Sequence, residues 1–438
     1  MQLYLPPEMR SSVLRRRATT AFGIYGAALL GLLATVVAAR ELGDKDDFAR
    51  FALVFATVSL LQLFLDLTID EVVVKYGNRY AAREDWGRFR RLFAIGLQLK
   101  LAGGVLGALA VAASALAAPW VWNTPDLRTP MLVAALIPLV QAPEGMGGAV
   151  LLVRNRYDLR GLLLLWSMAL RLTAIAVGAS RGVTQLFVAI VVAQAMATGT
   201  VLFVALAAFR RYPSVPSEPL GDDRAAIRAF AIQSTVGSGL TSLRSLLPMV
   251  LIGVVAKPEP VANFRIAQAP QTAFASLSAP ARLVLLAEQT RDIEQGRSDR
   301  AYRLLRRYIL GTTAFALVLV PVLWVAMPTL IRVAYGARYV PATNAARVIL
   351  LAAAVQLVFG WTRSFPVSIG RPGLRTVGQL VEIAVLVPSL LVLAHLYGAT
   401  GAAGSVLAGS VALAVFWTWG LFWVRRRPML GVPAEVTE

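Results

Sequence analysis

The sequence lacks cysteine entirely and contains a single histidine, His395. The absence of cysteine excludes disulfides, thiolate metal sites and cysteine nucleophiles, and one histidine excludes a metal site built from several imidazoles. Charge is also scarce, because only 15% of the 438 residues are charged, against about a quarter in an average soluble protein. We therefore expect neither a metal site nor a cofactor. Hydrophobic residues, by contrast, make up 57% of the chain.

The apolar residues fall into blocks that are nearly free of charge. Each block has about 18–25 residues, which is long enough to cross the hydrocarbon core of a bilayer as a helix. The sequence thus predicts an all-α polytopic membrane protein of about twelve transmembrane helices. The predicted spans are 18–39, 48–74, 92–118, 131–153, 161–180, 184–208, 229–254, 261–287, 308–331, 345–365, 376–397 and 401–424.

The net charge of +19 would suggest nucleic-acid binding in a soluble protein. Here the basic residues gather in short connections between the apolar blocks: one set of alternate connections holds 28 Lys and Arg residues and the other holds 7. Cytoplasmic loops carry this excess in membrane proteins. We expect an inner-membrane, multi-pass protein with both termini in the cytoplasm and no nucleic-acid partner. No cleavable signal peptide is predicted.

Several residues recur at a constant spacing close to half the chain length, which indicates an internal duplication. Gln141, Gly145, Arg156 and Arg160 match Gln356, Gly360, Arg371 and Arg375, each displaced by 215. We predict two six-helix lobes, residues 1–212 and 213–438, packed around a central cavity. Two parallel lobes of this kind open a cavity to one side of the membrane at a time.

Four segments resemble the polysaccharide transporter branch of the multidrug/oligosaccharidyl-lipid/polysaccharide exporter superfamily. They are Arg40–Gly43 with Phe48–Phe51, Asp66-Leu67, Arg88–Phe93, and Tyr335–Ala342, which contains the Gly-x-x-Tyr pattern at Gly336 and Tyr339. The glycine usual after Asp66-Leu67 is replaced by Thr68. The resemblance implies a flippase for polyprenyl-pyrophosphate-linked oligosaccharides, with a membrane lipid-linked glycan as substrate, a coupling cation (H⁺ or Na⁺) and polysaccharide-assembly enzymes as partners.

Basic residues inside the predicted spans are the first candidates for the site. Charges within a bilayer are costly, and they face a cavity or a partner. A pyrophosphate headgroup needs such cations, and a guanidinium can bind phosphate oxygens in bidentate fashion. We interpret Arg171, Arg244, Lys100 and Arg282 as substrate-binding. The competing interpretations are that each pairs with an acidic neighbour, or that Lys100 and Arg282 extend towards the interface.

Acidic residues inside the spans are candidates for cation coupling. Asp66 and Asp70 are four residues apart on one helical face, so each disfavours ionisation of the other unless a cation lies close. Glu144 lies between Pro143 and Gly145, a composition that predicts a broken helix. Glu382 lies within the eleventh span. We interpret these four as ion-coupling residues, although salt bridges to basic neighbours would also explain them.

Three classes of function are open at this point. The first is a lipid-linked oligosaccharide flippase that works by alternating access. The second, a cation-coupled drug or small-molecule exporter of the same superfamily, should have an acidic or aromatic cavity, and the deep arginines argue against it. The third, a membrane-embedded cell-envelope enzyme, is disfavoured because the outer connections are too short for a catalytic domain. We therefore expect a transporter and not an enzyme.

Overall fold

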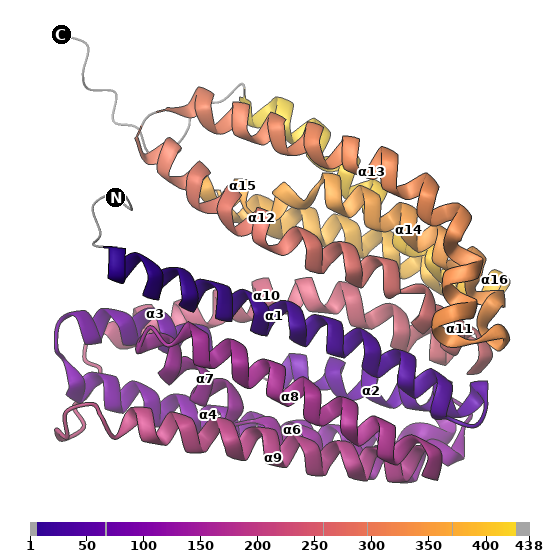
Figure 1. Cartoon of the computed structure of the whole chain (residues 1–438), viewed down its shortest axis with the longest axis horizontal. Helices are drawn as coiled ribbons and strands as arrows, with labels where there is room; N and C mark the ends of the chain where they lie inside the picture. The colour runs from indigo at the N-terminus through magenta and orange to yellow at the C-terminus, as the bar shows by residue number, and fades with distance from the viewer. Residues whose placement is uncertain (1–6, 66–67, 257, 296, 370, 426–438) are drawn as a thin grey trace. The chain divides into compact units, whose positions relative to one another are not determined.

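The computed structural model describes residues 7–65, 68–256, 258–295, 297–369 and 371–425, and the part of the chain it describes is helical, without a strand (Figure 1). The N-terminal helices are α1 Pro7–Glu41, α2 Lys45–Leu65, α3 Ile69–Ala82, α4 Trp86–Val121, α5 Arg128–Ala134, α6 Leu136–Gln141, α7 Glu144–Val153, α8 Tyr157–Gly178 and α9 Val183–Phe209. They are followed by α10 Asp223–Val255, α11 Pro258–Ala267, α12 Ala269–Glu294, α13 Ser298–Tyr335, α14 Thr343–Val358, α15 Phe365–Ser368 and α16 Pro372–Arg425.

The membrane character of the fold is confirmed. Eight helical segments of the described residues are long and apolar enough to cross a bilayer. They contain nine of the twelve predicted spans, because two of these, 376–397 and 401–424, lie in α16 on either side of Gly398, whose φ is +56°. The other three predicted spans coincide with α2–α3, with α10 and with α11–α12. The chain is thus an all-α, multi-pass membrane protein.

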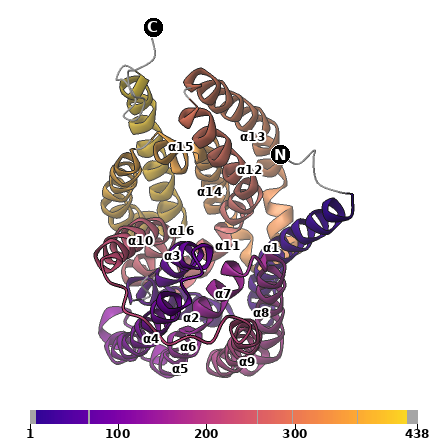
Figure 2. The same cartoon turned by 90° about the vertical axis from the view of Figure 1, so that its left-hand side faces the viewer.

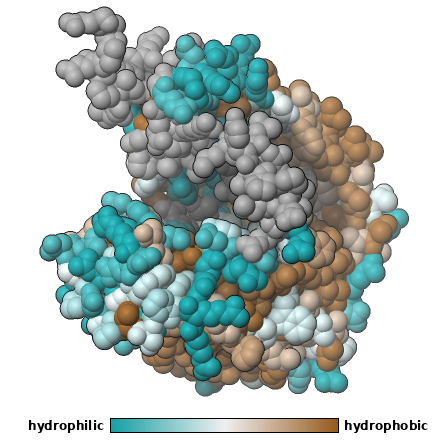
Figure 3. Space-filling model, turned by 60° about the vertical axis from the view of Figure 1, so that its left-hand side comes forward, coloured by the Kyte–Doolittle hydropathy of each residue, from teal (hydrophilic) through white to brown (hydrophobic). Residues whose placement is uncertain are grey.

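Large apolar side chains remain exposed along these helices, as a lipid-facing surface requires. Phe203 and Leu317 expose 75% and 71% of their area. Figure 3 shows hydrophobic residues covering a broad flank, with hydrophilic residues gathered towards the end that faces the viewer. A soluble monomer rarely exposes contiguous apolar area of this extent.

The chain divides into two compact units, residues 1–246 and 247–438. The division falls inside α10, later than the predicted lobe boundary between residues 212 and 213. The reason is tertiary packing: the first part of α10 lies against α3 of the N-terminal unit. A boundary drawn from apolar blocks and loops does not register such a contact.

α3 and the first part of α10 run antiparallel and are joined along their length. At one end the backbone N–H of Thr68 donates to Thr235 Oγ1 over 3.2 Å, and Ser234 bonds to Glu71. At the other end the hydroxyl of Tyr80 donates to Asp223 over 3.0 Å. These contacts make α3 and residues 223–235 one packed pair.

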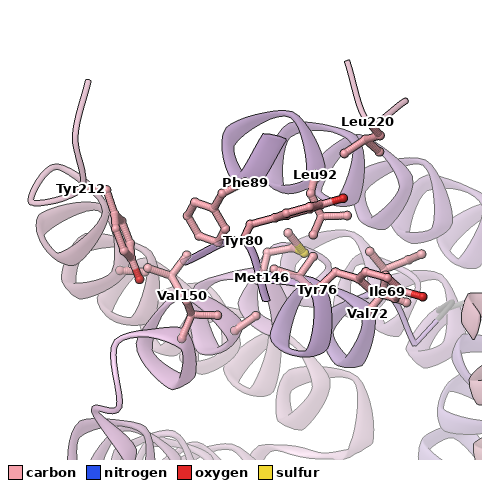
Figure 4. Packing of buried hydrophobic residues seen from close by; sticks show 14 residues of the cluster. Ile69, Val72, Tyr76, Tyr80, Phe89, Leu92, Met146, Val150, Tyr212 and Leu220 are labelled. Atoms are coloured by element: carbon pink, nitrogen blue, oxygen red, sulfur yellow. The ribbon is translucent and has the colours of Figure 1, made fainter. Parts of the chain in front are cut away.

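An apolar cluster made of side chains from α3, α4 and α7 packs against the first part of α10 (Figure 4). Tyr80 and Phe89 are almost fully buried in it, and Tyr212 packs against Phe89 with ring centroids 5.0 Å apart. The segment between α9 and α10 is held on the α3–α4 turn, since Glu218 N–H donates to the Gly87 carbonyl over 3.2 Å. These contacts hold the segment that leads into the first residue of α10.

Tyr80 gives a test of this packing. Burial, followed by the hydrogen bond to Asp223, raises the pKa of Tyr80 to about 12. The folded protein therefore keeps the phenolic proton that the unfolded chain loses near pH 10. The free energy of unfolding should be undiminished below pH 10 and should fall as pH rises from about 10 to about 12.

At pH 8, Tyr80→Phe should lower the free energy of unfolding by about 1–3 kcal/mol, because it leaves the Asp223 carboxylate without this donor. Chemical unfolding of the purified protein in detergent would measure it. Tyr25→Phe is the matched control, since Tyr25 is 41% exposed on α1 and should change nothing. Equal stability of wild type and Tyr80→Phe would contradict the prediction.

Within the N-terminal unit, α1 lies along α8 (Figures 1 and 2). The two helices approach closely at a pair of glycines: a Cβ added to Gly23 would lie 2.3 Å from the carbonyl carbon of Gly161. Any larger residue at position 23 would force the helices apart. This contact fixes α8, which carries Arg171.

The C-terminal unit repeats the interrupted fourth span of the N-terminal unit. In the N-terminal unit, the helix ends at Gln141 and resumes at Glu144; in the C-terminal unit, α14 ends at Val358 and a 3₁₀ turn, Gly360–Arg363, leads to α15. The end of α14 at Val358 follows the end of α6 at Gln141 by 217 residues, close to the displacement of 215 found in the sequence.

Candidate functional site

The interruption between α6 and α7 creates the candidate site. Pro143 has no N–H, so it cannot donate the bond that the carbonyl of Leu139 would accept in a continuous helix. Two turn residues separate Gln141 from Glu144. The broken helix predicted from Pro143, Glu144 and Gly145 is confirmed, and it places the carboxylate of Glu144 at the start of α7.

A hydrogen-bonded chain runs from Glu144 to Arg171 across three helices. Arg171 Nη2 on α8 donates to Gln194 Oε1 on α9 over 3.1 Å. Gln194 Nε2 donates in turn to Glu144 Oε2 on α7 over 2.7 Å. No carboxylate of the described residues lies within 4.0 Å of the Arg171 guanidinium, so the amide separates the two charges.

The middle of this chain is buried and its ends are not. Gln194 and Thr198 are each 4% exposed, whereas Arg171 and Glu144 are partly exposed. Thr198 Oγ1 accepts from Gln194 Nε2 over 3.2 Å and donates to Glu144 Oε2 over 3.5 Å. Both N–H groups of the amide are therefore used, which satisfies a polar group that would be costly to bury alone.

A second charged pair lies beside the first. Lys100 Nζ on α4 and Asp70 Oδ1 on α3 are 3.0 Å apart, with 4% and 38% of their side chains exposed. A Cβ on Gly145 would lie 3.6 Å from both Lys100 Nζ and Asp70 Cγ. Lys100 therefore does not extend towards the interface, and the pair touches the first turn of α7 next to Glu144.

The structure thus gathers four of the eight predicted site residues around one helix start: Arg171, Glu144, Lys100 and Asp70. Arg244 lies on α10 and is partly buried, and Glu382 lies on α16 at 1% exposure. Asp66 falls outside the described residues, as does the side chain of Arg282.

Sequence reasoning missed the uncharged members of the network. Gln194 and Thr198 stand four residues apart in a highly apolar span, so they share one helical face. Two polar residues at this spacing in an apolar helix indicate a polar contact on that face. Arg347 was also missed; it lies on α14 and donates from Nε to the carbonyl of Trp324 over 3.0 Å.

The C-terminal unit has a polar chain that begins near the end of α14. Gln271 Nε2 donates to Gln356 Oε1 over 3.0 Å, and Gln356 Nε2 donates to Ser410 Oγ over 2.9 Å. Gln356 is the duplicate of Gln141.

The Lys100–Asp70 pair can be tested by a double-mutant cycle. Lys100→Met, Asp70→Asn and the double variant should show a coupling free energy of about 1 kcal/mol, at the low end for a buried pair because Asp70 is 38% exposed. The Arg156–Asp158 pair, with Arg156 38% exposed, is the control and should couple less. Chemical unfolding in detergent measures both, and additive single effects at Lys100 and Asp70 would show that the two do not interact.

The chain was compared with known protein families and with known proteins. Residues 13–286 match the model of a family described as polysaccharide biosynthesis protein. No curated protein sequence matches the chain.

Solved structures share the fold at low sequence identity. A multidrug resistance transporter of the MATE family, MOP superfamily, in an inward-facing conformation has a TM-score of 0.76 at 13% identity, over 91% of this chain and 94% of that one. The lipid II flippase MurJ, in an inward closed conformation, has 0.66 at 12% identity, over 93% and 88%. A MOP superfamily transporter from Pyrococcus furiosus, described as having a binding pocket of reverse polarity, has 0.65 at 13% identity, over 94% and 95%.

The family model covers more than half of the chain, including the whole Arg171–Gln194–Glu144 network and the Lys100–Asp70 pair. The chain belongs to the polysaccharide biosynthesis protein family.

Proposed function

We propose that this protein is a flippase that moves a polyprenyl-pyrophosphate-linked oligosaccharide from the cytoplasmic to the outer leaflet of the inner membrane. The two six-helix lobes would expose the substrate path to one side at a time, with both termini in the cytoplasm. Membership of the polysaccharide biosynthesis family supports a glycan cargo. One of the proteins with a similar fold is described as a lipid II flippase, which is consistent with a lipid-linked cargo.

Arg171 is the observation that carries the proposal. A pyrophosphate headgroup has at least two negative charges and must pass hydrocarbon, so its path needs cations that are not already neutralised. Lys100 is engaged by Asp70 at 3.0 Å, whereas the described partner of Arg171 is the neutral amide of Gln194. A guanidinium has five N–H donors, and Gln194 takes one.

The acidic residues of the network suit a coupling cation, H⁺ or Na⁺. Glu144 and Asp70 are carboxylates inside the membrane domain, and each already lies beside a cation or a polar donor. We propose that one of them takes the cation during the cycle, and that polysaccharide-assembly enzymes supply and consume the lipid-linked glycan. A drug exporter for organic cations is disfavoured, since Arg171 would repel such cargo.

The experiment is complementation of a strain that lacks the gene. We expect the deletion strain to accumulate lipid-linked glycan in the inner leaflet, and the wild-type gene to restore surface polysaccharide. Arg171→Ala and Arg244→Ala should not restore it, although the proteins should be present in the membrane. Absence of glycan accumulation in the deletion strain would refute the proposed cargo.

A further inference from the structure

The polar chain of the C-terminal unit crosses three helices. α14 packs against α12 and against α16 (Figure 1), and the chain joins Gln271 on α12, Gln356 on α14 and Ser410 on α16. Polar side chains between membrane helices hydrogen-bond to one another across the interface. Ser410 follows this rule, because it is 1% exposed and uses both its proton and its oxygen.

The buried end of the polar chain sets the direction of each bond in it. Ser410 Oγ donates to the carbonyl of Val406 over 2.8 Å, so its oxygen is left to accept. The amino group of Gln356 donates to that oxygen over 2.9 Å, which turns the amide oxygen of Gln356 towards Gln271. Gln271 must then present an N–H, and it does so over 3.0 Å. Bonds aligned in one direction polarise and strengthen one another.

The other end of the polar chain is not satisfied within the protein. Gln271 is partly exposed, and its bond to Gln356 is the single hydrogen bond that its side chain makes to the described residues. An amide has two N–H donors and an oxygen with two lone pairs. Such atoms are costly in a membrane unless they meet a partner. Gln271 therefore presents one donor and one acceptor to a ligand.

A second amide lies one turn earlier on the same face. Gln268 joins α11 to α12 without a break in the helical bonds, because its N–H donates to Phe264 and its carbonyl accepts from Thr272, each over 3.1 Å. Residues three apart in a helix are about 5–6 Å apart at Cβ, so Gln268 lies beside Gln271. Gln268 is partly exposed too, and its side chain makes no hydrogen bond to the part of the chain that the structure describes. A bond that only joined α12 to α14 would not require this second amide.

We infer that Gln268 and Gln271 bind hydroxyl groups of the glycan, and that Gln356 is the positioning residue that holds the amide of Gln271. An amide suits a sugar because its oxygen accepts from one hydroxyl while its N–H donates to the next, and both partners are neutral. Arg171 suits the phosphate part of the cargo, and these amides suit its uncharged part. The inference rests on the proposed function, since it names the residues that recognise the sugar.

The test uses the full chain purified in detergent and two probes. One is the lipid-linked glycan extracted from the deletion strain, and the other is undecaprenyl pyrophosphate, which has the charged headgroup and no sugar. Gln271→Met keeps the length of the side chain and should weaken binding of the glycan probe about 5- to 20-fold, the loss of one or two hydrogen bonds. Its affinity for undecaprenyl pyrophosphate should stay that of wild type. Calorimetric titration would measure both dissociation constants.

Further variants test the second amide and the positioning role. Gln268→Met should also weaken the glycan probe alone. Gln356→Met should weaken it about 2- to 5-fold, and the double variant with Gln271→Met should bind no more weakly than Gln271→Met, because Gln356 acts through Gln271. Gln98→Met is the control, since Gln98 is an exposed glutamine on α4, and it should bind both probes like wild type.

The outcomes separate this inference from the proposed function. If Gln268→Met and Gln271→Met bind both probes like wild type, the amides do not contact the sugar, and the inference is refuted while the flippase proposal stands. If Gln271→Met weakens both probes by the same factor, Gln271 has a structural role and the inference is refuted as well. If the deletion strain accumulates no lipid-linked glycan, the proposed function is refuted and the inference with it. A loss confined to the glycan probe supports the inference.

Discussion

Arg171→Met is expected to reduce transport of the lipid-linked glycan by about 10- to 100-fold, which corresponds to the loss of one or two charge-assisted hydrogen bonds to a phosphate group. Methionine keeps the length and the apolar stem of the side chain, so the helix packing around Phe55, whose ring lies 5.6 Å from the guanidinium carbon, should be preserved. Arg171→Lys should retain part of the activity, because it keeps the charge but loses the bidentate geometry. Transport in reconstituted vesicles, normalised to the protein inserted, would measure all three proteins.

The control for this prediction lies on the same helix. Arg156 is paired with Asp158 near the start of α8, so Arg156→Met removes an arginine that already has its counter-charge and should change transport less than about threefold. Transport by Arg171→Met at the wild-type rate would show that the guanidinium only stabilises Gln194 and Glu144. In that case Arg171 would be a structural residue, and the substrate path would have to be sought elsewhere in the membrane domain.

The charged half of the network could be predicted from the sequence because a charge within an apolar block is conspicuous. Arg171 and Glu144 stand in spans where each neighbouring turn is apolar, and the energetic cost of placing them there implies a partner. What the sequence could not give was the partner itself. Gln194 carries no charge, and single polar residues are common enough in membrane helices that its role emerges only when α7, α8 and α9 are seen together.

The helix break at Pro143 and the lobe boundary show the same contrast. Pro143 breaks the helix because it has no N–H, and this local effect can be predicted from the residue type alone. The first part of α10 is held on the N-terminal unit by the contacts of Phe230 with Tyr76 and of Asp223 with Tyr80, residues that are far apart in the chain and meet through packing. No periodicity in α10 encodes tertiary contacts of this kind.

The kink of α16 should be the most sensitive point of the C-terminal unit. The helix doubles back at Gly398, so that Gly378 lies by Trp417 and Gly401 lies by Leu393. A Cβ on Gly401 would lie 1.8 Å from the carbonyl oxygen of Leu393. This atom belongs to the backbone and cannot rotate away, so the two arms of α16 would have to separate.

Gly401→Ala is therefore expected to lower the free energy of unfolding by about 3 kcal/mol or more, the upper range for overpacking. Gly404→Ala is the matched control one turn later, where the nearest atom to an added Cβ is Leu393 Cδ1 at 3.9 Å; alanine there should be neutral or slightly stabilising, because it favours the helix over glycine. Thermal unfolding of the purified variants followed by circular dichroism would compare the two. Equal unfolding temperatures for both variants would mean that the arms can part at Gly401 without cost, and the kink would then be a flexible joint and not a fixed turn.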